Sequence, residues 1–411
     1  MRGTRPEDDV AVQVGPADRR DLAVALCVAA AVVALQWPLR LCSLNLMDEG
    51  LVLQVADDLA RGSLLYRDAA LYAFPGAFTL LAAAFQTWGS RVEVARTLAV
   101  VVFALASGVV YLMARWWYAR RPALGVVALF VVYRVWAYPH WQFFGYATFA
   151  VAWGLAATWL LGEGLARGRG ALVLAAGVAS GLAICGKQDA GVATTVALAG
   201  AALLQAPAAR LGRWAAVGRF GVGAAVGVVG LLVWLLVEGI AGDFLREAIL
   251  APLYGVQHFA YQRRPSLWPL GPPDPTLRAG LFGWFPAILL DTWFVPLTAT
   301  WLWRETGVVD ACVKLFYYLP PVVLLAGAMT WWRDRARVSP ATSARALVTV
   351  ALGGAFALAF NPPQDWVHLL VLFPATLLLS AYLWARHAAG RPRLQWLGLS
   401  AALGAVGLAA V

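Results

Sequence analysis

Residues 217–238 read VGRFGVGAAVGVVGLLVWLLVE, and the only charged side chains in this stretch, Arg219 and Glu238, lie near its two ends. About 20 predominantly apolar residues suffice to cross the hydrocarbon core of a bilayer as one helix. Further stretches of this kind occur at 21–41, 94–114, 122–137, 147–162, 171–186, 190–206, 310–332, 344–360, 367–385 and 394–411. The sequence therefore predicts an all-α polytopic membrane protein with about 11 transmembrane helices, in a range of roughly 10–13.

The composition excludes several other classes of protein. The 411 residues are 61% hydrophobic and only 13% charged, whereas soluble domains have about 45–50% apolar and about 25% charged residues. A large water-soluble enzyme and a disordered chain are both excluded. The net charge of +10 comes from arginines scattered in short clusters between apolar blocks, with Lys187 and Lys314 as the only lysines. A nucleic-acid binder gathers its basic residues on one patch, so no nucleic-acid partner is expected.

Charge also predicts how the chain threads the membrane. Two more apolar stretches, 74–88 and 281–303, are interrupted by glycine, proline or aspartate. If both lie on the outer surface, the N-terminus and the short arginine-rich loops share one side, which is then cytoplasmic by the positive-inside rule. We therefore expect a cytoplasmic tail at 1–20 and a single domain at 21–411 in the bacterial inner (plasma) membrane.

The two longest outer loops are expected to cover the active site. They comprise residues 42–93 and 239–309, the first and fourth outer loops, and each is predicted to carry juxtamembrane helices. Segment 50–61 has apolar residues at helical spacing with acidic residues opposite, which indicates an amphipathic helix lying in the membrane interface.

Asp48 and Glu49 directly follow the first predicted span. A carboxylate at that depth is costly unless it has a function, and it could act as a general base toward an acceptor hydroxyl. The alternative is that Asp48 caps the N-terminus of the amphipathic helix, a role in which aspartate is common. Both interpretations fit the position.

Three outer segments carry side chains that could bind a phosphate. Arg67 offers a planar fork for phosphate or pairs with its neighbour Asp68. Lys187 lies in a very short outer turn, where it could bind a lipid phosphate or pair with a nearby aspartate across two helix ends. Asp365 and His368, three residues apart on one helix face, could hold phosphate or sugar, or else cap a helix and anchor it at the interface. Weaker candidates for substrate contacts are Tyr72, Tyr138, Gln188, Asp189 and His258.

These candidates converge on one face of the membrane. The chain has neither a soluble βαβ region nor a glycine-rich nucleotide-binding fingerprint, so a cytoplasmic nucleotide-sugar donor is not expected. A carboxylate base, cations and an amphipathic shelf at the lipid boundary favour transfer of a group from a lipid phosphate.

Several short patches then resemble a known superfamily. They are LNLMDEG at 44–50, ARG at 60–62, YRD at 66–68 and YAFPG at 72–76, followed by Arg96, by KQD at 187–189, and by Asp365 with His368. The chain resembles the GT-C superfamily of membrane glycosyltransferases. It looks most like the branch of protein O-mannosyltransferases and lipid A aminoarabinose transferases, and within it the bacterial family-39-like proteins.

The resemblance implies roles for individual residues. Asp48 would be the catalytic base or would orient the acceptor, Glu49 would assist acceptor or metal binding, and Lys187 would lie near the donor phosphate. Loop 239–309 would shape the acceptor site. The chain departs from the family where it has Pro75-Gly76 in place of Pro-Pro, and Gly-Lys-Gln in place of Thr-Lys-Gly.

We therefore expect an inverting glycosyltransferase with its active site on the extracytoplasmic side. Its donor would be a polyprenyl-phosphate sugar, and its acceptor a hydroxyl of a lipid, glycan or protein. No cofactor is required by the pattern, and a divalent metal with Asp48 as ligand stays open. The alternative is a transporter or flippase of lipid-linked sugars, which needs the same polar cavity but opens to both sides.

Overall fold

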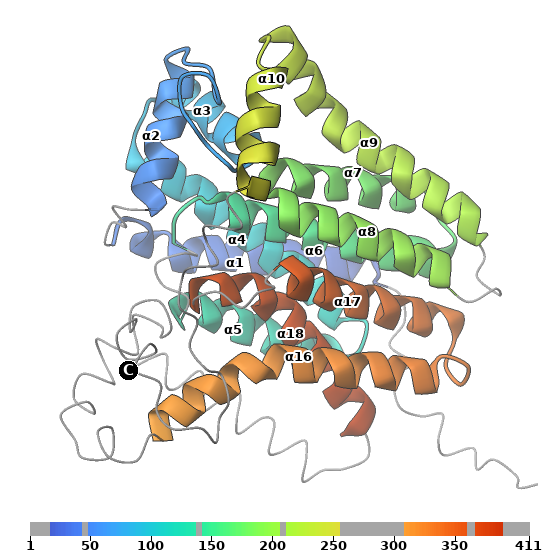
Figure 1. Ribbon diagram of the computed structural model, residues 1–411. Coiled ribbons are helices and arrows are strands. Elements are labelled where there is room, and N and C mark those ends of the chain that lie inside the picture. The colour runs from blue at the N-terminus through green and yellow to red at the C-terminus, as the bar shows by residue number, and fades with distance from the viewer. Residues whose placement is uncertain are drawn as a thin grey trace, which may run out of the picture.

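The computed structural model describes residues 17–42, 48–136, 142–205, 211–254, 308–359 and 366–388. Within these ranges the regular secondary structure is helical, and most helices run side by side in one bundle (Figure 1). The predicted all-α class is confirmed for the described residues.

The helices follow the apolar blocks of the sequence. Their bounds are α1 (Arg19–Gln36), η2 (Pro38–Leu41), α2 (Asp48–Ala60), α3 (Gly76–Trp88), α4 (Val92–Ala114), α5 (Arg120–Trp136), α6 (Tyr146–Arg167), α7 (Gly170–Gly186), α8 (Gln188–Leu204), α9 (Arg213–Val237), α10 (Ala241–Phe244), η3 (Leu245–Leu250), α16 (Val308–Asp334), α17 (Pro340–Ala359) and α18 (Trp366–His387). Each predicted span up to 367–385 coincides with one of these helices, whereas 394–411 lies outside the described residues.

Four of the described helices, α4, α6, α9 and α17, are long and apolar enough to cross a membrane, judged by length and composition. Helices α7 and α8 are apolar but have only 17 residues each. These helices support an integral membrane protein, and the total of about 11 spans stays a prediction.

The two short helices α2 and α3, between α1 and α4, were both expected from the sequence. Stretch 74–88 forms α3, whose 13 residues extend about 20 Å and are too short for a hydrocarbon core of about 30 Å. Segment 50–61 forms most of α2, which buries Val52, Val55 and Ala56 against α3 and exposes Gln54. The other doubtful stretch, 281–303, lies outside the described residues.

Glycines let α7 and α9 approach very closely. Gly177 and Gly181 of α7 face Gly223 and Gly227 of α9, and each pair is four residues apart on its helix. A Cβ atom on Gly177 would lie 2.1 Å from the Phe220 carbonyl oxygen, so no larger residue fits without moving the helices. This small-residue packing is typical of membrane helices, where close van der Waals contact drives association.

Helix α6 connects two polar regions at opposite ends of the bundle. With 22 residues it is about 33 Å long. Its first residue, Tyr146, contacts Tyr72 of the first loop. Near its other end, the buried Glu163 accepts hydrogen bonds from Trp116 and Arg345. The ion pairs of Asp21 with Arg115 and Arg120 lie at this second end too, because Arg115 adjoins Trp116.

This grouping agrees with the prediction that the N-terminus and the loops at 115–121, 163–170 and 333–345 share one side. Which compartment that side faces stays a prediction.

Candidate functional site

A buried ion pair fixes the start of α2. The Glu49 carboxylate accepts hydrogen bonds from Arg96 Nε at 2.5 Å and from Arg96 Nη2 at 2.6 Å. Both residues are only 1–2% exposed. Arg96 Nη1 also donates to the backbone carbonyls of Arg40 and Cys42, at the end of η2. One guanidinium group of α4 therefore holds both the end of η2 and the first turn of α2.

The position of Glu49 changes its expected role. The resemblance implied that Glu49 assists acceptor or metal binding, but its carboxylate is buried and engaged by Arg96. In this structure Glu49 therefore anchors the backbone beside Asp48 and does not face an open site.

Asp48 is the first residue of α2, and unlike Glu49 it is exposed. Since the helix already includes it, Asp48 lies in the first turn, where a negative charge interacts favourably with the helix dipole. The capping hypothesis expected Asp48 to be the N-cap, the residue just before the helix, whereas in the structure Asp48 is the first helical residue.

The hydroxyl of Tyr146 contacts one of the predicted residues and is affected by the charges of two others. It lies 3.0 Å from the Tyr72 hydroxyl, and the negative charges of both Asp48 and Asp189 act on it. The Tyr146 ring also stacks on Phe78 of α3. Tyr146 was not among the residues singled out from the sequence. An aromatic residue at the start of a span, typical of interfacial belts, was the only signal that pointed to it.

Gln188 docks the first outer loop onto the turn between α7 and α8. Its Nε2 donates to the Tyr72 carbonyl at 2.7 Å, and its Oε1 accepts from the backbone N–H of Phe74 at 3.3 Å. The close approach continues at Gly76, where a Cβ would lie 2.7 Å from the Cys185 carbonyl oxygen. This contact gives a physical reason for glycine in place of the family's second proline.

Lys187 lies in the same turn, between the end of α7 and the start of α8. Its ammonium group forms an ion pair with Asp189, whose other carboxylate oxygen accepts from the backbone N–H of Ala190. The Lys–Asp pair considered from the sequence is therefore present. The Lys187 side chain is 15% exposed and that of Asp189 is 45% exposed, so an approaching anion meets the pair from solvent.

Arg67 has different partners from those expected. Its Nε lies 3.1 Å from Asp243 Oδ2 and its Nη2 donates to the Gly239 carbonyl at 2.6 Å. The neighbouring Asp68 instead accepts from the backbone N–H of Leu64. In this structure Arg67 therefore holds the segment after α2 against Gly239 and Asp243, at the start of α10. These hydrogen-bond partners differ from Tyr72, the partner of the Tyr146 hydroxyl.

The same loop contains a strained residue, Tyr66, whose φ of 69° lies in the left-handed region. Its hydroxyl donates to the Ala73 carbonyl at 2.9 Å and its ring packs edge-on against Phe244. Burial raises the pKa of the Tyr66 phenol well above its usual value, so the neutral form is strongly favoured.

Other predicted site residues cannot be placed with these. Tyr138, His258 and Asp365 lie outside the described residues, and His368 lies in α18 at a position where only the helix is described. In the parts of the chain that the structure describes, no group of three or more His, Cys, Asp or Glu side chains could hold a metal ion.

Comparison with known proteins shows a similar fold in a solved structure, but no matching family or curated protein. No protein-family model matches the chain, and no curated protein matches it. Among solved structures, the fold is similar to that of ArnT from Cupriavidus metallidurans, crystallised bound to undecaprenyl phosphate, with a TM-score of 0.51 and 16% identity. The match covers 92% of this chain and 62% of the ArnT chain, so this chain spans less than two thirds of ArnT's length.

At this identity the likeness concerns the fold alone. The chain thus has a fold similar to that of ArnT and contains helices long and apolar enough to cross a membrane. At one end of the bundle, the exposed Asp48 and the Asp189 of a lysine–aspartate pair both act electrostatically on Tyr146.

Proposed function

We propose that the protein is an inverting glycosyltransferase that moves a sugar from a polyprenyl-phosphate donor to an acceptor hydroxyl. The observation that carries this proposal is that Tyr72 contacts the Tyr146 hydroxyl, on which the charges of Asp48 and Asp189 also act, while Asp189 pairs with Lys187. The likeness to a protein crystallised with undecaprenyl phosphate supports a polyprenyl-phosphate donor.

Asp48 is the general base of the proposed reaction. Its carboxylate takes the proton of the acceptor hydroxyl while that oxygen attacks C1 of the sugar. The bond between C1 and the phosphate oxygen breaks on the opposite face, so the configuration at C1 inverts. The exposure of Asp48 allows it to reach an acceptor, and the buried Glu49–Arg96 pair holds its backbone in place.

Lys187 would stabilise the phosphate as it leaves. The departing group gains negative charge in the transition state, and a fixed cation at that point lowers the barrier most in a partly dehydrated site. Because Lys187 is now paired with Asp189, the donor phosphate must take the place of that carboxylate. Asp189 would then be free to contact a sugar hydroxyl.

The test uses the purified protein in proteoliposomes with a panel of undecaprenyl-phosphate sugars and with bacterial membrane extract as the acceptor source. Release of undecaprenyl phosphate and formation of a new glycosidic bond are measured by mass spectrometry. Asp48→Asn should lower the rate by about 10²–10⁴-fold and leave donor binding intact, as expected for loss of a general base.

Asp58→Asn is the matched control, because Asp58 lies on the same helix and its carboxylate is bonded to Gln54. Its rate should stay within about twofold of that of the unaltered protein, the range of an ordinary surface substitution. A fully active Asp48→Asn variant would remove Asp48 from the mechanism. Net movement of the sugar lipid across the bilayer without a new bond would show a transporter instead.

A further inference from the structure

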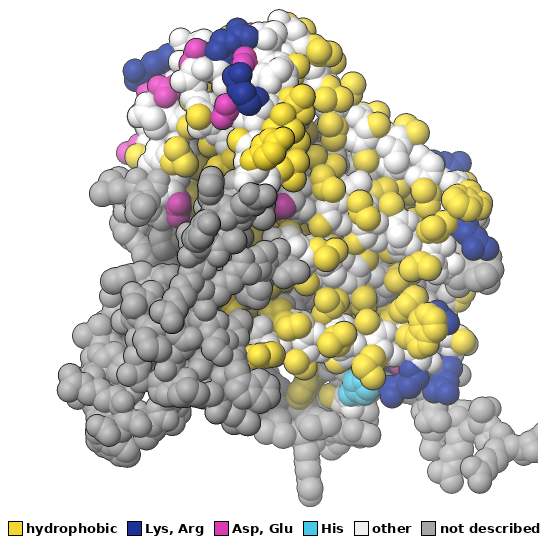
Figure 2. Space-filling model, in the orientation of Figure 1, with side chains coloured by type: hydrophobic (Ala, Val, Ile, Leu, Met, Phe, Trp, Pro, Cys, Tyr) yellow, Lys and Arg dark blue, Asp and Glu magenta, His cyan; other side chains and the backbone are white. Residues whose placement is uncertain are grey.

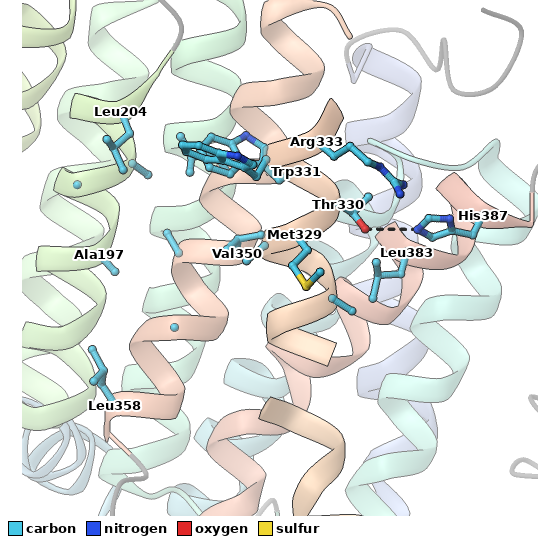
Figure 3. A pocket seen from close by; sticks show the side chains of 18 residues that line it. Ala197, Leu204, Met329, Thr330, Trp331, Arg333, Val350, Leu358, Leu383 and His387 are labelled. Atoms are coloured by element: carbon cyan, nitrogen blue, oxygen red, sulfur yellow. Dashed lines mark hydrogen bonds between the residues drawn. The ribbon is translucent and has the colours of Figure 1, made fainter. Parts of the chain in front are cut away.

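A large apolar groove lies away from the proposed active site. It has a volume of about 1110 Å³ and is formed by α8, α16, α17 and α18. Figure 3 shows its walls, with Ala197 and Leu204 on one side and Met329 and Leu383 on the other. The volume is at the upper end of the range of small-molecule sites, about 300–1,000 Å³, so a long flexible chain could occupy it.

The groove opens on a surface suited to hydrocarbon. Hydrophobic side chains cover the face formed by α8, α16 and α17 (Figure 2). At the groove itself, Leu204, Met329 and Leu358 are each 65–72% exposed. Large apolar patches on a soluble surface mark interaction sites, and in a membrane protein such a face contacts lipid chains. The groove therefore opens on an apolar face of the bundle.

One end of the groove is cationic. Arg333 lines it beside His387, whose Nε2 lies 3.3 Å from the Thr330 hydroxyl (Figure 3). Arg335 is stacked 3.2 Å above the ring of Trp332, which also lines the groove.

The negative charge of Asp334, which lies between Arg333 and Arg335 in the sequence, does not neutralise the charges of both arginines. It is held by Arg386 through two hydrogen bonds at 2.7 and 3.0 Å, and Arg333 Nε is 3.5 Å from its other oxygen. Arg333, Arg335, Trp331 and Trp332 therefore lie where an apolar groove meets the end of the bundle. Arginines and tryptophans at such a boundary are typical of a lipid headgroup site.

We propose that this groove binds a phospholipid with an anionic headgroup. Its acyl chains lie between α8 and α16, over α17, and its phosphate contacts Arg333 and Arg335. The polyprenyl-phosphate donor is not the expected occupant, because Lys187 precedes α8 at its other end, about 26 Å from Leu204. The site is thus separate from the proposed reaction, and the lipid acts as a packing element between α8 and α16.

Two glycines offer a way to fill the groove. Gly200 and Gly354 line it, and a Cβ atom on either would meet no other atom within 4 Å. Leucines at both positions would therefore occupy the space of the acyl chains without displacing the helices. Gly221 and Gly230 of α9 also have open space around them and lie outside the groove, so leucines there form a matched control.

The experiment is native mass spectrometry of the full chain released from nanodiscs of equal parts phosphatidylglycerol and phosphatidylethanolamine. The unaltered protein should retain phosphatidylglycerol preferentially. Gly200→Leu with Gly354→Leu should lower that retention by about tenfold or more, because several methylene contacts are lost. Gly221→Leu with Gly230→Leu should leave it unchanged.

The charge of the site is tested with Arg333→Gln and Arg335→Gln. Each should weaken phosphatidylglycerol binding about fivefold and phosphatidylethanolamine binding less, because the ammonium group of phosphatidylethanolamine offsets the charge of its phosphate. The proposal is overturned if the leucine pair retains as much phosphatidylglycerol as its control, or if both lipids respond equally to the arginine changes. Retention of undecaprenyl phosphate, lost only in the groove variant, would overturn the choice of occupant. Thermal unfolding of every variant, compared with the α9 control, separates loss of the lipid from loss of the fold.

Discussion

The Glu49 carboxylate and the Arg96 guanidinium form a buried ion pair with two short hydrogen bonds, and this pair joins α2 to α4. Arg96 also holds two backbone carbonyls at the end of η2. The exposed Asp48 is therefore next to a residue that a buried ion pair holds in place. A reactive group needs such support, because a small displacement from its working geometry reduces the rate strongly.

Replacing Arg96 with methionine should destabilise the protein by about 3–5 kcal/mol, because it leaves the Glu49 charge buried without its partner. The measurement is the temperature at which the detergent-solubilised protein loses its monodisperse chromatographic peak. Arg61→Met is the control, since Arg61 pairs with Asp57 on the exposed side of α2 and its side chain is 74% exposed. Equal melting temperatures for the two variants would contradict a structural role of the buried pair.

Tyr146→Phe should reduce the rate of sugar transfer by up to about tenfold. The change removes one hydroxyl hydrogen bond, the one to Tyr72, worth about 0.5–1.5 kcal/mol, at a position on which the charges of Asp48 and Asp189 act. Turnover at saturating donor measures the effect. Tyr254→Phe, at a tyrosine that is 73% exposed, should have the rate of the unaltered protein. If both variants behave alike, Tyr146 does not organise the site.

Gly76→Ala should destabilise the outer loop by about 1–3 kcal/mol, because its Cβ would collide with the Cys185 carbonyl oxygen at 2.7 Å. Gly125→Ala in α5 should instead raise stability by about 0.5–1 kcal/mol, since its Cβ meets no atom within 4 Å and alanine favours a helix. Limited proteolysis of loop 61–75 compares the two variants. Tolerance of alanine at Gly76 would show that the loop does not pack on α7 as described.

The two ends of the bundle should face opposite sides of the membrane. In a variant whose native cysteines are replaced, Asp58→Cys should react with a membrane-impermeant maleimide in intact cells. Arg335→Cys should react only after permeabilisation, because α6 separates the two regions by about 33 Å. Labelling of both positions from outside would contradict the predicted threading.

The apolar blocks were sufficient to locate the helices, because a helix in lipid needs an uninterrupted apolar run and its ends show as charges or glycines. The prediction at 171–186 differs from α7 by one residue, and that at 147–162 matches the start of α6 within one residue. The short helices α2 and α3 were also expected, from amphipathic spacing and from length.

The pairing of charged residues could not be predicted in the same way. Glu49 is 47 residues from Arg96, and Arg67 is 176 residues from Asp243. A sequence shows which charges exist but not which distant helix brings a partner to them. Arg67 thus seemed available for a phosphate, and Glu49 for a substrate, until the folded chain showed their partners. Asp48, Tyr72 and Asp189 were expected only to share one face, and that they form one site stays a prediction. Tyr146, which contacts Tyr72 and on which the charges of Asp48 and Asp189 act, was not singled out from the sequence.

The glycine contact of α9 with α7 has a consequence for how such proteins diverge. Only 17% of the apolar window of α9 is buried, and the rest of this helix, including Val226 and Val229, faces outward. Outward positions tolerate any residue that dissolves in lipid, whereas Gly223 and Gly227 tolerate none but glycine. Random exchange among valine, leucine and isoleucine therefore erases residue identity without moving a helix. The arrangement of the helices can thus stay the same while the amino-acid sequence changes. The fold of this chain is similar to that of ArnT at a sequence identity of only 16%.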